Sequence, residues 1–349
     1  MSFSYILIQW YLQNKRDLPW RSTKNPYHIW LSEIILQQTR VDQGMEYYHK
    51  FIMKYPAVED LAQADEEAVL KLWQGLGYYS RARNLHHTAR YVAGEMNGKF
   101  PVSYQELIRL KGIGDYTASA IASICNNEPV AVVDGNVFRV IARYFGIETP
   151  IDTSKGKTIF KKLAQEHMER SDPGTYNQAL MEFGARQCKP QNPQCNSCPL
   201  QTECHAFRNK ETDNLPVKQN RTRVKNRYFN YIVFNSSVDQ TLINIRDKKG
   251  IWQGLYEFPL VESTGEIDRN RLLNNEQFKS IVRNNFSAVN LFNEEQIIHK
   301  LSHQHLHVKF WIVTSIKDPD GSISWEEFDT YPVPVVIANF VKIFNRNGK

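Results

Sequence analysis

The sequence predicts a mainly α-helical domain followed by an α+β domain. Up to residue 186, apolar residues recur every three or four positions, and turns marked by Gly or Pro separate the helical stretches. After residue 227 the pattern changes to short β-type runs. Since 42% of the 349 residues are hydrophobic, the chain is long and apolar enough for two packed cores.

Each element is predicted from its own spacing. In the first part we expect a helix over 29–41, helical turns at 69–73, a helix that starts near Asp115 and a helix-like stretch over 135–144. In the second part we expect strands at 228–234, 241–245 and 306–316, and helices near 269–284 and 335–344. These patterns place a helical domain at 1–204, a linker at 205–227 and an α+β domain at 228–349. The linker carries seven Lys or Arg against two Asp or Glu, so it is able to lie along a phosphate backbone.

Charge and hydropathy narrow the class of protein. The formal net charge of +6 favours an anionic partner, although charge alone does not identify one. No apolar run approaches the roughly 20 residues that a membrane-spanning helix needs. The first 20 residues lack the basic start and small-residue cleavage site of a secretion signal. We therefore expect a soluble protein of the cell interior, without a membrane partner.

Four cysteines give the strongest chemical signal in the sequence. Cys188, Cys195, Cys198 and Cys204 lie within 17 residues, whereas Cys125 stands alone. Four thiolates this close together can surround one metal centre, either a tetrahedral zinc ion or an iron–sulfur cluster. Zinc sites usually come as two close pairs, so the gaps of six and five residues favour iron, but spacing alone leaves both open.

Several motifs together make the sequence similar to a known family. The cysteine spacing, the Gly112-Ile113-Gly114 turn and Asp134 resemble the endonuclease III superfamily of DNA glycosylases. The segments 18–21, 30–39, 75–79 and 133–137 resemble its MutY-type adenine glycosylases. The resemblance covers residues 10–204 densely and the C-terminal domain more loosely. It implies a helix–hairpin–helix glycosylase fold, a [4Fe–4S] cluster held by the four cysteines, and a Nudix-like C-terminal domain.

The resemblance assigns the chemistry to two carboxylates. Glu33 matches the family's catalytic acid, which must stay protonated near neutral pH to protonate adenine at N7. Asp134 matches an ionised aspartate that stabilises the positive sugar as the base leaves. From the pattern alone, Glu33 would lie on a solvated helix face and Asp134 would be a helix N-cap. Tyr116 and Asn136 match neighbouring positions of the same site.

Other matched residues are expected to bind the substrate. A stacked base hides its glycosidic bond, so the adenine must be flipped out of the duplex. A planar tyrosine can then wedge between base steps. The matched residues are Trp20, Arg21 and Glu182 in the adenine pocket, and Gln37, Gln38, Thr39 and Tyr78 at the orphaned partner base.

The turn at residues 110–115 predicts a phosphate site. Gly112 and Gly114 would let the backbone turn with positive φ and approach a ligand closely. Exposed amides and the positive end of the following helix can hold a phosphate without reading sequence. In bifunctional relatives a catalytic lysine stands at the position of Tyr116. Because tyrosine cannot form a Schiff base with the sugar, a monofunctional glycosylase is predicted.

The C-terminal domain is expected to inspect the partner base. Residues 250–259 resemble the start of a Nudix domain, but the metal-binding Glu cluster is missing downstream, so we predict no diphosphohydrolase activity. In MutY-type enzymes a Phe-Ser-His loop contacts 8-oxoguanine, and here the loop reads Leu301-Ser302-His303. Ser302 and His303 can hydrogen-bond the oxidised base, whereas Leu301 removes a stacking surface. The alternating histidines from His303 to His307 are expected to form a polar strand face rather than a metal site.

The sequence thus predicts a monofunctional DNA glycosylase that excises adenine paired with 8-oxoguanine, or with guanine, in base excision repair. Its expected partner is duplex DNA that contains adenine opposite 8-oxoguanine. We expect a monomer in the cytoplasm, associated with the nucleoid if the source is bacterial. Three alternatives stay open: a bifunctional glycosylase/lyase for oxidised pyrimidines, a non-catalytic DNA-binding protein, and a Nudix-type nucleotide hydrolase.

Overall fold

The computed structural model describes residues 2–220, 224–236 and 239–347. The chain divides into two units, residues 1–63 with 84–221 and residues 64–83 with 222–349. The second unit therefore joins a short helical segment to the C-terminal α+β domain. The domain boundaries at 204 and 227 stay a prediction. Within the predicted linker, α12 (His205–Arg208) lies at the start and β1 (Lys225–Asn235) covers the end, while residues 221–223 lie outside the described residues.

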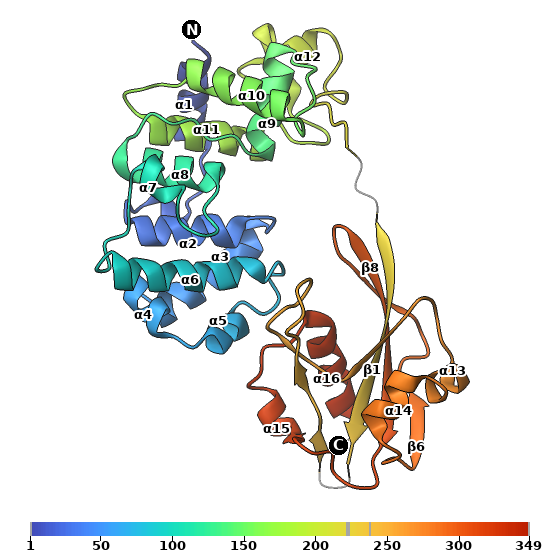
Figure 1. The fold of residues 1–349 in the computed structure, drawn as a ribbon. Helices are drawn as coiled ribbons and strands as arrows, with labels where there is room; N and C mark the ends of the chain where they lie inside the picture. Colours follow the sequence, from blue (N-terminus) through green and yellow to red (C-terminus); the bar gives the residue numbers. More distant parts are fainter. Residues whose placement is uncertain (1, 221–223, 237–238, 348–349) are drawn as a thin grey trace. The chain divides into compact units, whose positions relative to one another are not determined.

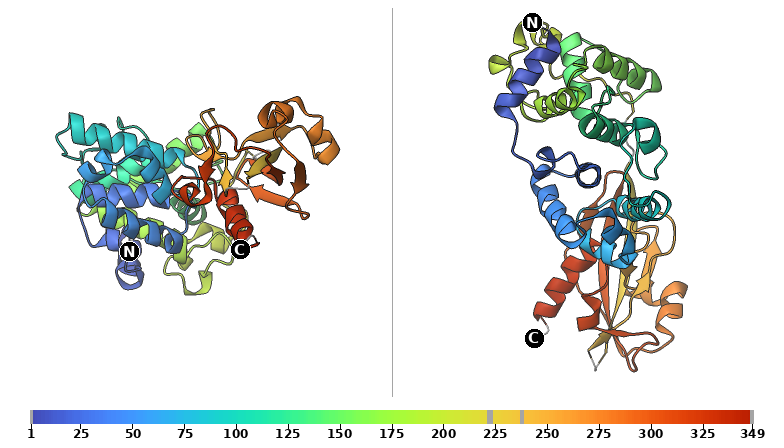
Figure 2. Two further views of the ribbon diagram at one scale, coloured as in Figure 1. Left: turned by 90° about the horizontal axis from the view of Figure 1, so that it is seen from below. Right: turned by 90° about the vertical axis from the view of Figure 1, so that its left-hand side faces the viewer.

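The first unit is built from helices (Figures 1 and 2). They are α1 (Phe3–Asn14), α2 (Pro26–Leu36), α3 (Val41–Lys54), α4 (Val58–Gln63), most of α6 (Ser80–Glu95), α7 (Tyr104–Leu107), α8 (Asp115–Asn126), α9 (Gly135–Phe145), α10 (Ser154–Glu166) and α11 (Pro173–Arg186). The first helix, α1, packs against α11 and shares a core with α9 and α10, while α2 packs against α3 and α8. In the described part of the chain, no helix is long and apolar enough to cross a membrane.

Helix α2 is shorter at its C-terminal end than the sequence predicts. The predicted helix over 29–41 is wrong, because α2 begins at Pro26 and ends at Leu36. Gln38 adopts a φ of +58°, which a right-handed helix does not allow. The apolar spacing continues to Val41 only because that residue begins α3. Helix α9, in contrast, confirms the prediction over 135–144, and Asp134 is its N-cap.

The second unit contains a mixed sheet with helices on both faces (Figures 1 and 2). Its strand order is β5 (Leu260–Ser263), β1, β8 (Gln304–Thr314) and β6 (Ala288–Leu291), and β7 (Ile297–Lys300) also pairs with β8. Strands β1 and β8 run parallel along their whole length. On one face Phe310 stacks on Phe340 of α16 (Val335–Asn347) at 4.0 Å between ring centroids.

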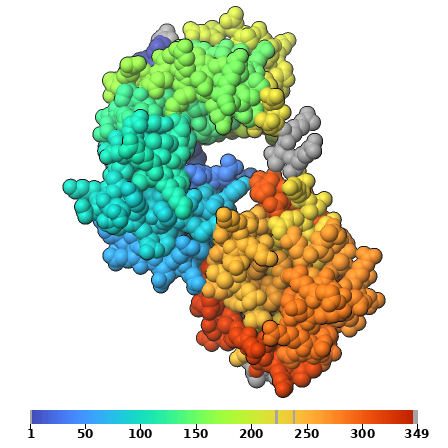
Figure 3. Space-filling model, viewed as in Figure 1, coloured from blue at the N-terminus to red at the C-terminus, as the bar shows by residue number. Residues whose placement is uncertain are grey.

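The other face of the sheet packs against α13 (Arg269–Leu273) and α14 (Glu276–Val282), where Trp311 and Phe278 share a core. Figure 3 shows the outer surface of this part of the second unit, in orange. Because both faces are covered, β1 has a nearly continuous buried run rather than an alternating one. The predicted strand at 241–245 is wrong as one element, since β2 (Gln240–Thr241) pairs with β9 (Ile323–Ser324) and β3 (Asn244–Ile245) pairs with β4 (Tyr256–Glu257).

Candidate active site

Glu33 lies in the middle of α2, where every side chain from Tyr27 to Ile35 except His28 is buried. The side chain of Glu33 is 8% exposed, so the solvated helix face suggested by spacing alone does not exist. Burial raises the pKa of Glu33 to about 7, the negative charge of Asp134 adds to the rise, and a hydrogen bond with Tyr116 opposes it. This carboxyl group can therefore hold a proton near neutral pH and donate it.

Asp134 is held in a different way from Glu33. As the N-cap of α9, its Oδ1 accepts the backbone N–H groups of Asn136 at 2.9 Å and Val137 at 2.8 Å. Its Oδ2 accepts the side-chain amide of Asn136 at 2.8 Å. Burial raises the pKa of Asp134, but these three donors and the charge of Arg139 oppose the rise. Glu33 thus has one hydrogen bond, from Tyr116, whereas Asp134 accepts from three donors. Because donors stabilise the ionised form, this difference favours protonation of Glu33 over Asp134.

Tyr116 lies in the first turn of α8, near both carboxyl groups. Its hydroxyl hydrogen-bonds Glu33 and lies 3.5 Å from the sulfur of Met181. Burial and the two negative charges raise its pKa well above the ordinary value. Tyr116 therefore stays a neutral phenol, and the structure brings Glu33, Tyr116, Asp134 and Asn136 into one cluster.

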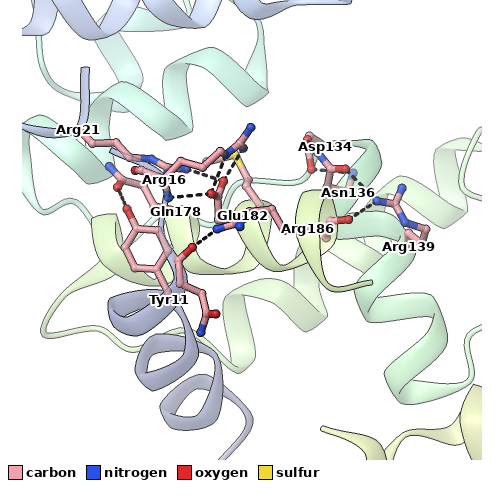
Figure 4. A network of polar contacts seen from close by, with 12 residues as sticks. Tyr11, Arg16, Arg21, Asp134, Asn136, Arg139, Gln178, Glu182 and Arg186 are labelled. Atoms are coloured by element: carbon pink, nitrogen blue, oxygen red, sulfur yellow. Dashed lines mark hydrogen bonds and ion pairs between the residues drawn. The ribbon is translucent and has the colours of Figure 1, made fainter. Parts of the chain in front are cut away.

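Glu182 from α11 is bound by two arginines (Figure 4). Arg16 binds both carboxylate oxygens, with Nε 2.8 Å from Oε1 and Nη2 2.6 Å from Oε2. Arg21 Nη2 donates to Oε2 at 2.8 Å. Burial alone would raise the pKa of Glu182, but the two guanidinium groups outweigh it and lower the pKa to about 2. Glu182 is therefore an anion that fixes two cations, and Trp20 next to them is buried against Tyr48 at 5.1 Å between ring centroids.

Three residues of this region were not predicted from the sequence. Arg16 stands in a polar run that resembles any loop, and Gln178 of α11, whose Oε1 accepts the hydroxyl of Tyr11 at 2.5 Å, has no distinguishing neighbour in the sequence. Arg139 of α9 was not predicted either. Figure 4 shows that Arg139 lies next to Asp134 and Asn136.

Arg139 connects the Asp134 cluster to the cysteine loop. Its Nη2 donates to Oδ1 of Asn136 at 2.9 Å and to the Gly184 carbonyl at 2.6 Å. Its Nε donates to the carbonyl of Cys188 at 2.7 Å. Because Asn136 also binds Asp134, a continuous chain of hydrogen bonds links that carboxylate to the first cysteine of the loop.

The four clustered cysteines line one hollow together with Arg143 and Leu200. None of the four forms a disulfide bond. Arg143 Nη1 lies 3.4 Å from the sulfur of Cys188 and 2.7 Å from the carbonyl of Lys189. Its Nε binds the carbonyl of Leu215 at 3.0 Å. In the described ranges 2–220, 224–236 and 239–347, no three His, Cys, Asp or Glu side chains are arranged to hold a single metal ion.

The predicted phosphate site lies between α7 and α8. Gly112 has a φ of +80°, and a Cβ there would stand 2.7 Å from Cβ of Asn84, so this position requires glycine. The prediction that Gly114 also has a positive φ is wrong, because its φ is −94° and it is the extended N-cap of α8. A Cβ at Gly114 would meet no protein atom within 4 Å. Gly114 therefore leaves open space in front of the helix N-terminus.

The residues expected at the partner base belong to both units. In the first unit, Gln37 Nε2 contacts the hydroxyl of Thr117 at 3.3 Å, and Thr39 contacts the Gln37 carbonyl at 3.3 Å. Gln38, between them, has the left-handed backbone noted above. In the second unit, Tyr78 has a φ of +50° and is 48% exposed. Such backbone conformations are uncommon for side chains of this size and are often found at functional sites.

Ser302 and His303 form the turn between β7 and β8, since the N–H of Leu301 donates to the carbonyl of Gln304 at 2.7 Å. Both side chains are exposed, and Oγ of Ser302 lies 3.1 Å from Nδ1 of His303. A pocket of the second unit brings this turn together with Tyr78, and its empty space is about 980 Å³ including open solvent. The pocket is also lined by Trp252, which has a φ of +61° and was not predicted.

Comparison with known families and structures gives consistent results for the two parts of the chain. Residues 31–166 match the HhH-GPD superfamily of base excision DNA repair proteins, and residues 230–342 match the NUDIX domain. A thermostable thymine-DNA glycosylase structure is similar with a TM-score of 0.55 and 29% identity, over 59% of this chain and 95% of that one. An endonuclease III–DNA complex shares the fold, with a TM-score of 0.51 and 23% identity over 59% of this chain and 95% of that one.

Curated relatives extend the match to the whole chain. An adenine DNA glycosylase of Buchnera aphidicola is 34% identical, over 98% of this chain and 97% of the relative. The adenine DNA glycosylase of Homo sapiens is 42% identical, over 61% of this chain and 41% of the relative. The mainly α-helical glycosylase fold with a Nudix-like second domain, predicted from the sequence, is therefore confirmed.

Proposed function

This chain belongs to the adenine DNA glycosylase family, and from that premise we propose that it removes adenine paired with 8-oxoguanine, or with guanine, from duplex DNA by hydrolysis. The observation that carries the proposal is the pair of carboxyl groups, in which the buried Glu33 has a pKa near 7 and the half-buried Asp134 is held by three donors. Such a pair supplies one acid and one anion to the same glycosidic bond.

The two groups divide the work of breaking the C–N bond. Protonated Glu33 donates its proton to N7 of a flipped adenine, so the electron pair of the breaking bond leaves with a neutral base. The sugar left behind carries positive charge, which the nearby Asp134 carboxylate stabilises. Water then adds to the sugar and gives up a proton that restores the acid form of Glu33, which leaves an abasic site. Tyr116 keeps Glu33 in place and, having no amine, forms no covalent bond with the sugar.

DNA is the partner that the remaining features support. The HhH-GPD match, the open N-terminus of α8 at Gly114 and the net charge of +6 suit a phosphate backbone. Ser302 and His303, which share a pocket with Tyr78, supply hydrogen-bonding groups for the oxidised partner base. Leu301 lines the same pocket without the stacking surface of an aromatic ring.

We propose a [4Fe–4S] cluster in the cysteine loop. The four thiols surround one hollow, none is used in a disulfide, and Arg143 brings positive charge to their edge. Soft thiolate donors with a neighbouring cation suit an iron–sulfur cluster. Cys188, Cys195, Cys198 and Cys204 would hold the cluster, which when bound supplies a cross-link for the loop rather than a reacting group.

A single-turnover cleavage assay tests the proposed function. Duplexes with adenine opposite 8-oxoguanine, guanine or thymine are compared, and we expect the fastest release of adenine opposite 8-oxoguanine. Glu33→Gln should abolish release, since it keeps the shape but loses the proton. Equal rates on all three duplexes would refute the partner-base assignment. Abundant covalent adduct after borohydride treatment would instead identify a glycosylase/lyase.

A further inference from the structure

The segment that carries Tyr78 is fixed to the C-terminal domain on both sides of that residue. It consists of residues 64–83, begins with α5 (Glu66–Leu72) and belongs to the second unit. The hydroxyl of Tyr256 donates to Glu67 at 2.6 Å, and Nζ of Lys71 donates to the carbonyl of Tyr331 at 2.9 Å. These two contacts lie on the N-terminal side of Tyr78.

Two more contacts lie closer to Tyr78 or beyond it. The N–H of Val333 donates to Oε1 of Gln74 at 3.1 Å. After Tyr78, Nη1 of Arg83 donates to the carbonyl of Gln253. The apolar packing agrees with these contacts, because a Cβ at Gly254 would lie 3.6 Å from a methyl group of Leu70. The C-terminal domain therefore contacts the segment on both sides of Tyr78 in the sequence, through Tyr256 and through the loops 250–254 and 331–333.

The loop around Tyr78 needs such support. Gly75, Gly77 and Tyr78 all have positive φ, and this conformation has a free-energy cost for a tyrosine. Inside the segment, Trp73 Nε1 and Arg81 Nη2 both donate to the Gly77 carbonyl at 3.1 Å. These internal contacts shape the turn. Tyr78 lines the pocket that also contains Ser302 and His303, and contacts to the C-terminal domain lie before and after it in the sequence.

We propose that Tyr256, Lys71, Glu67 and Gln74 are positioning residues, through which the C-terminal domain holds Tyr78 in its place at the partner base. The inference rests on the proposed function and deepens it. The C-terminal domain contributes not only its own turn at Ser302 and His303 but also the placement of a residue that precedes it by more than 200 positions. Loss of these contacts is expected to remove the contribution of Tyr78 to cleavage while leaving Glu33 and Asp134 unchanged.

A double-mutant cycle in the full-length protein tests the proposal. The first change is Tyr78→Ala, and the second is the pair Lys71→Met and Tyr256→Phe, which removes two hydrogen-bond donors and keeps the apolar parts. Tyr331→Phe is the matched control, because its hydroxyl donates to Glu327 at 2.9 Å while its ring keeps the contact with Tyr256. The readout is the single-turnover rate on whichever adenine-containing duplex the wild type cleaves faster.

The effect of Tyr78→Ala should differ between the three backgrounds. In the wild type and in Tyr331→Phe, Tyr78→Ala should slow cleavage by about tenfold or more, the size of one lost base–aromatic stack. In the Lys71→Met/Tyr256→Phe background the same change should slow it by less than about threefold, because Tyr78 is already misplaced. Equal effects in all backgrounds, or no effect of Tyr78→Ala anywhere, would overturn the proposal.

A second measurement separates positioning from misfolding and from failure of the proposed function. Amide hydrogen exchange of the Lys71→Met/Tyr256→Phe variant, without DNA, should be at least about tenfold faster in residues 73–79 and unchanged in β1. Unchanged exchange in residues 73–79 would overturn the proposal. A missing preference for 8-oxoguanine in the wild type would count against the proposed function alone, since neither the cycle nor the exchange depends on that preference.

Discussion

Glu182→Gln removes the carboxylate that binds both Arg16 and Arg21 in the network around α11. The carboxylate is 1% exposed and its pKa is lowered from 4.5 to about 2. A difference of roughly 2.5 units corresponds to about 3 kcal/mol of stability. Breaking a buried ion pair from one side costs a similar amount, about 3 to 5 kcal/mol. We therefore expect Glu182→Gln to lower the free energy of unfolding by about 3 kcal/mol at pH 7.

The stabilisation that Glu182 provides should depend on pH. The pKa of Glu182 is lower in the folded protein than in the unfolded chain. The contribution of Glu182 to the free energy of unfolding is therefore fully present above pH 4.5, the unfolded pKa, and is lost as the pH falls towards 2. The gap between wild type and Glu182→Gln should thus shrink to about 1.5 kcal/mol near pH 3. Urea unfolding followed by tryptophan fluorescence, at pH values from 7 to 3, measures the gap.

A matched control separates the buried network from charge in general. Glu46 pairs with Lys50 at 2.6 Å on the surface of α3, where the carboxylate is 66% exposed. Glu46→Gln should cost less than about 1 kcal/mol at every pH, as exposed pairs do. A gap for Glu182→Gln below about 1 kcal/mol at pH 7, or one that does not change between pH 7 and pH 3, would refute the reasoning.

Three further predictions concern the hairpin and the cysteine loop. Gly112→Ala should destabilise the fold by about 1–3 kcal/mol in a urea titration, because of its positive φ and the contact with Asn84. Gly114→Ala should leave stability within about 0.5 kcal/mol but weaken duplex binding in an anisotropy titration, and unchanged binding would contradict the phosphate site. Arg143→Gln should reduce the brown absorbance of the purified protein, because the loop loses its bonds to the carbonyls of Lys189 and Leu215, and full absorbance would contradict this.

The fold class was predictable because the two parts of the chain have different hydrophobic periods. Helix α9 and strand β8 follow directly from such spacing. The end of α2 was not predictable from spacing. The apolar residues of α2 and α3 form one continuous pattern, although the chain turns between the two helices at Gln38. Likewise, 241–245 has the composition of one strand but changes partner in the middle.

In the candidate site, the four cysteines stand out in the sequence because they are clustered within 17 residues. Glu33 and Asp134 were assigned only by resemblance to a known family, because the pattern alone favours a solvated helix face and a helix N-cap. Arg16, Arg139 and Gln178 were missed because their roles depend on partners far away in the sequence, such as Glu182 and Cys188. Periodicity also suggested solvent around Glu33, whereas packing against other helices buries it. The spacing within one helix does not show which of its faces the other helices cover.

The pKa of Glu33 is the quantity on which the proposed chemistry depends. It can be measured by carbon NMR of the labelled glutamate carboxyl groups, with Glu33→Gln to assign the signal. We expect a titration midpoint near 7, because the buried carboxyl group has one hydrogen-bonding partner and a negative neighbour in Asp134. A midpoint near 4.5, the ordinary value, would mean that the group is ionised at neutral pH and cannot supply the proton.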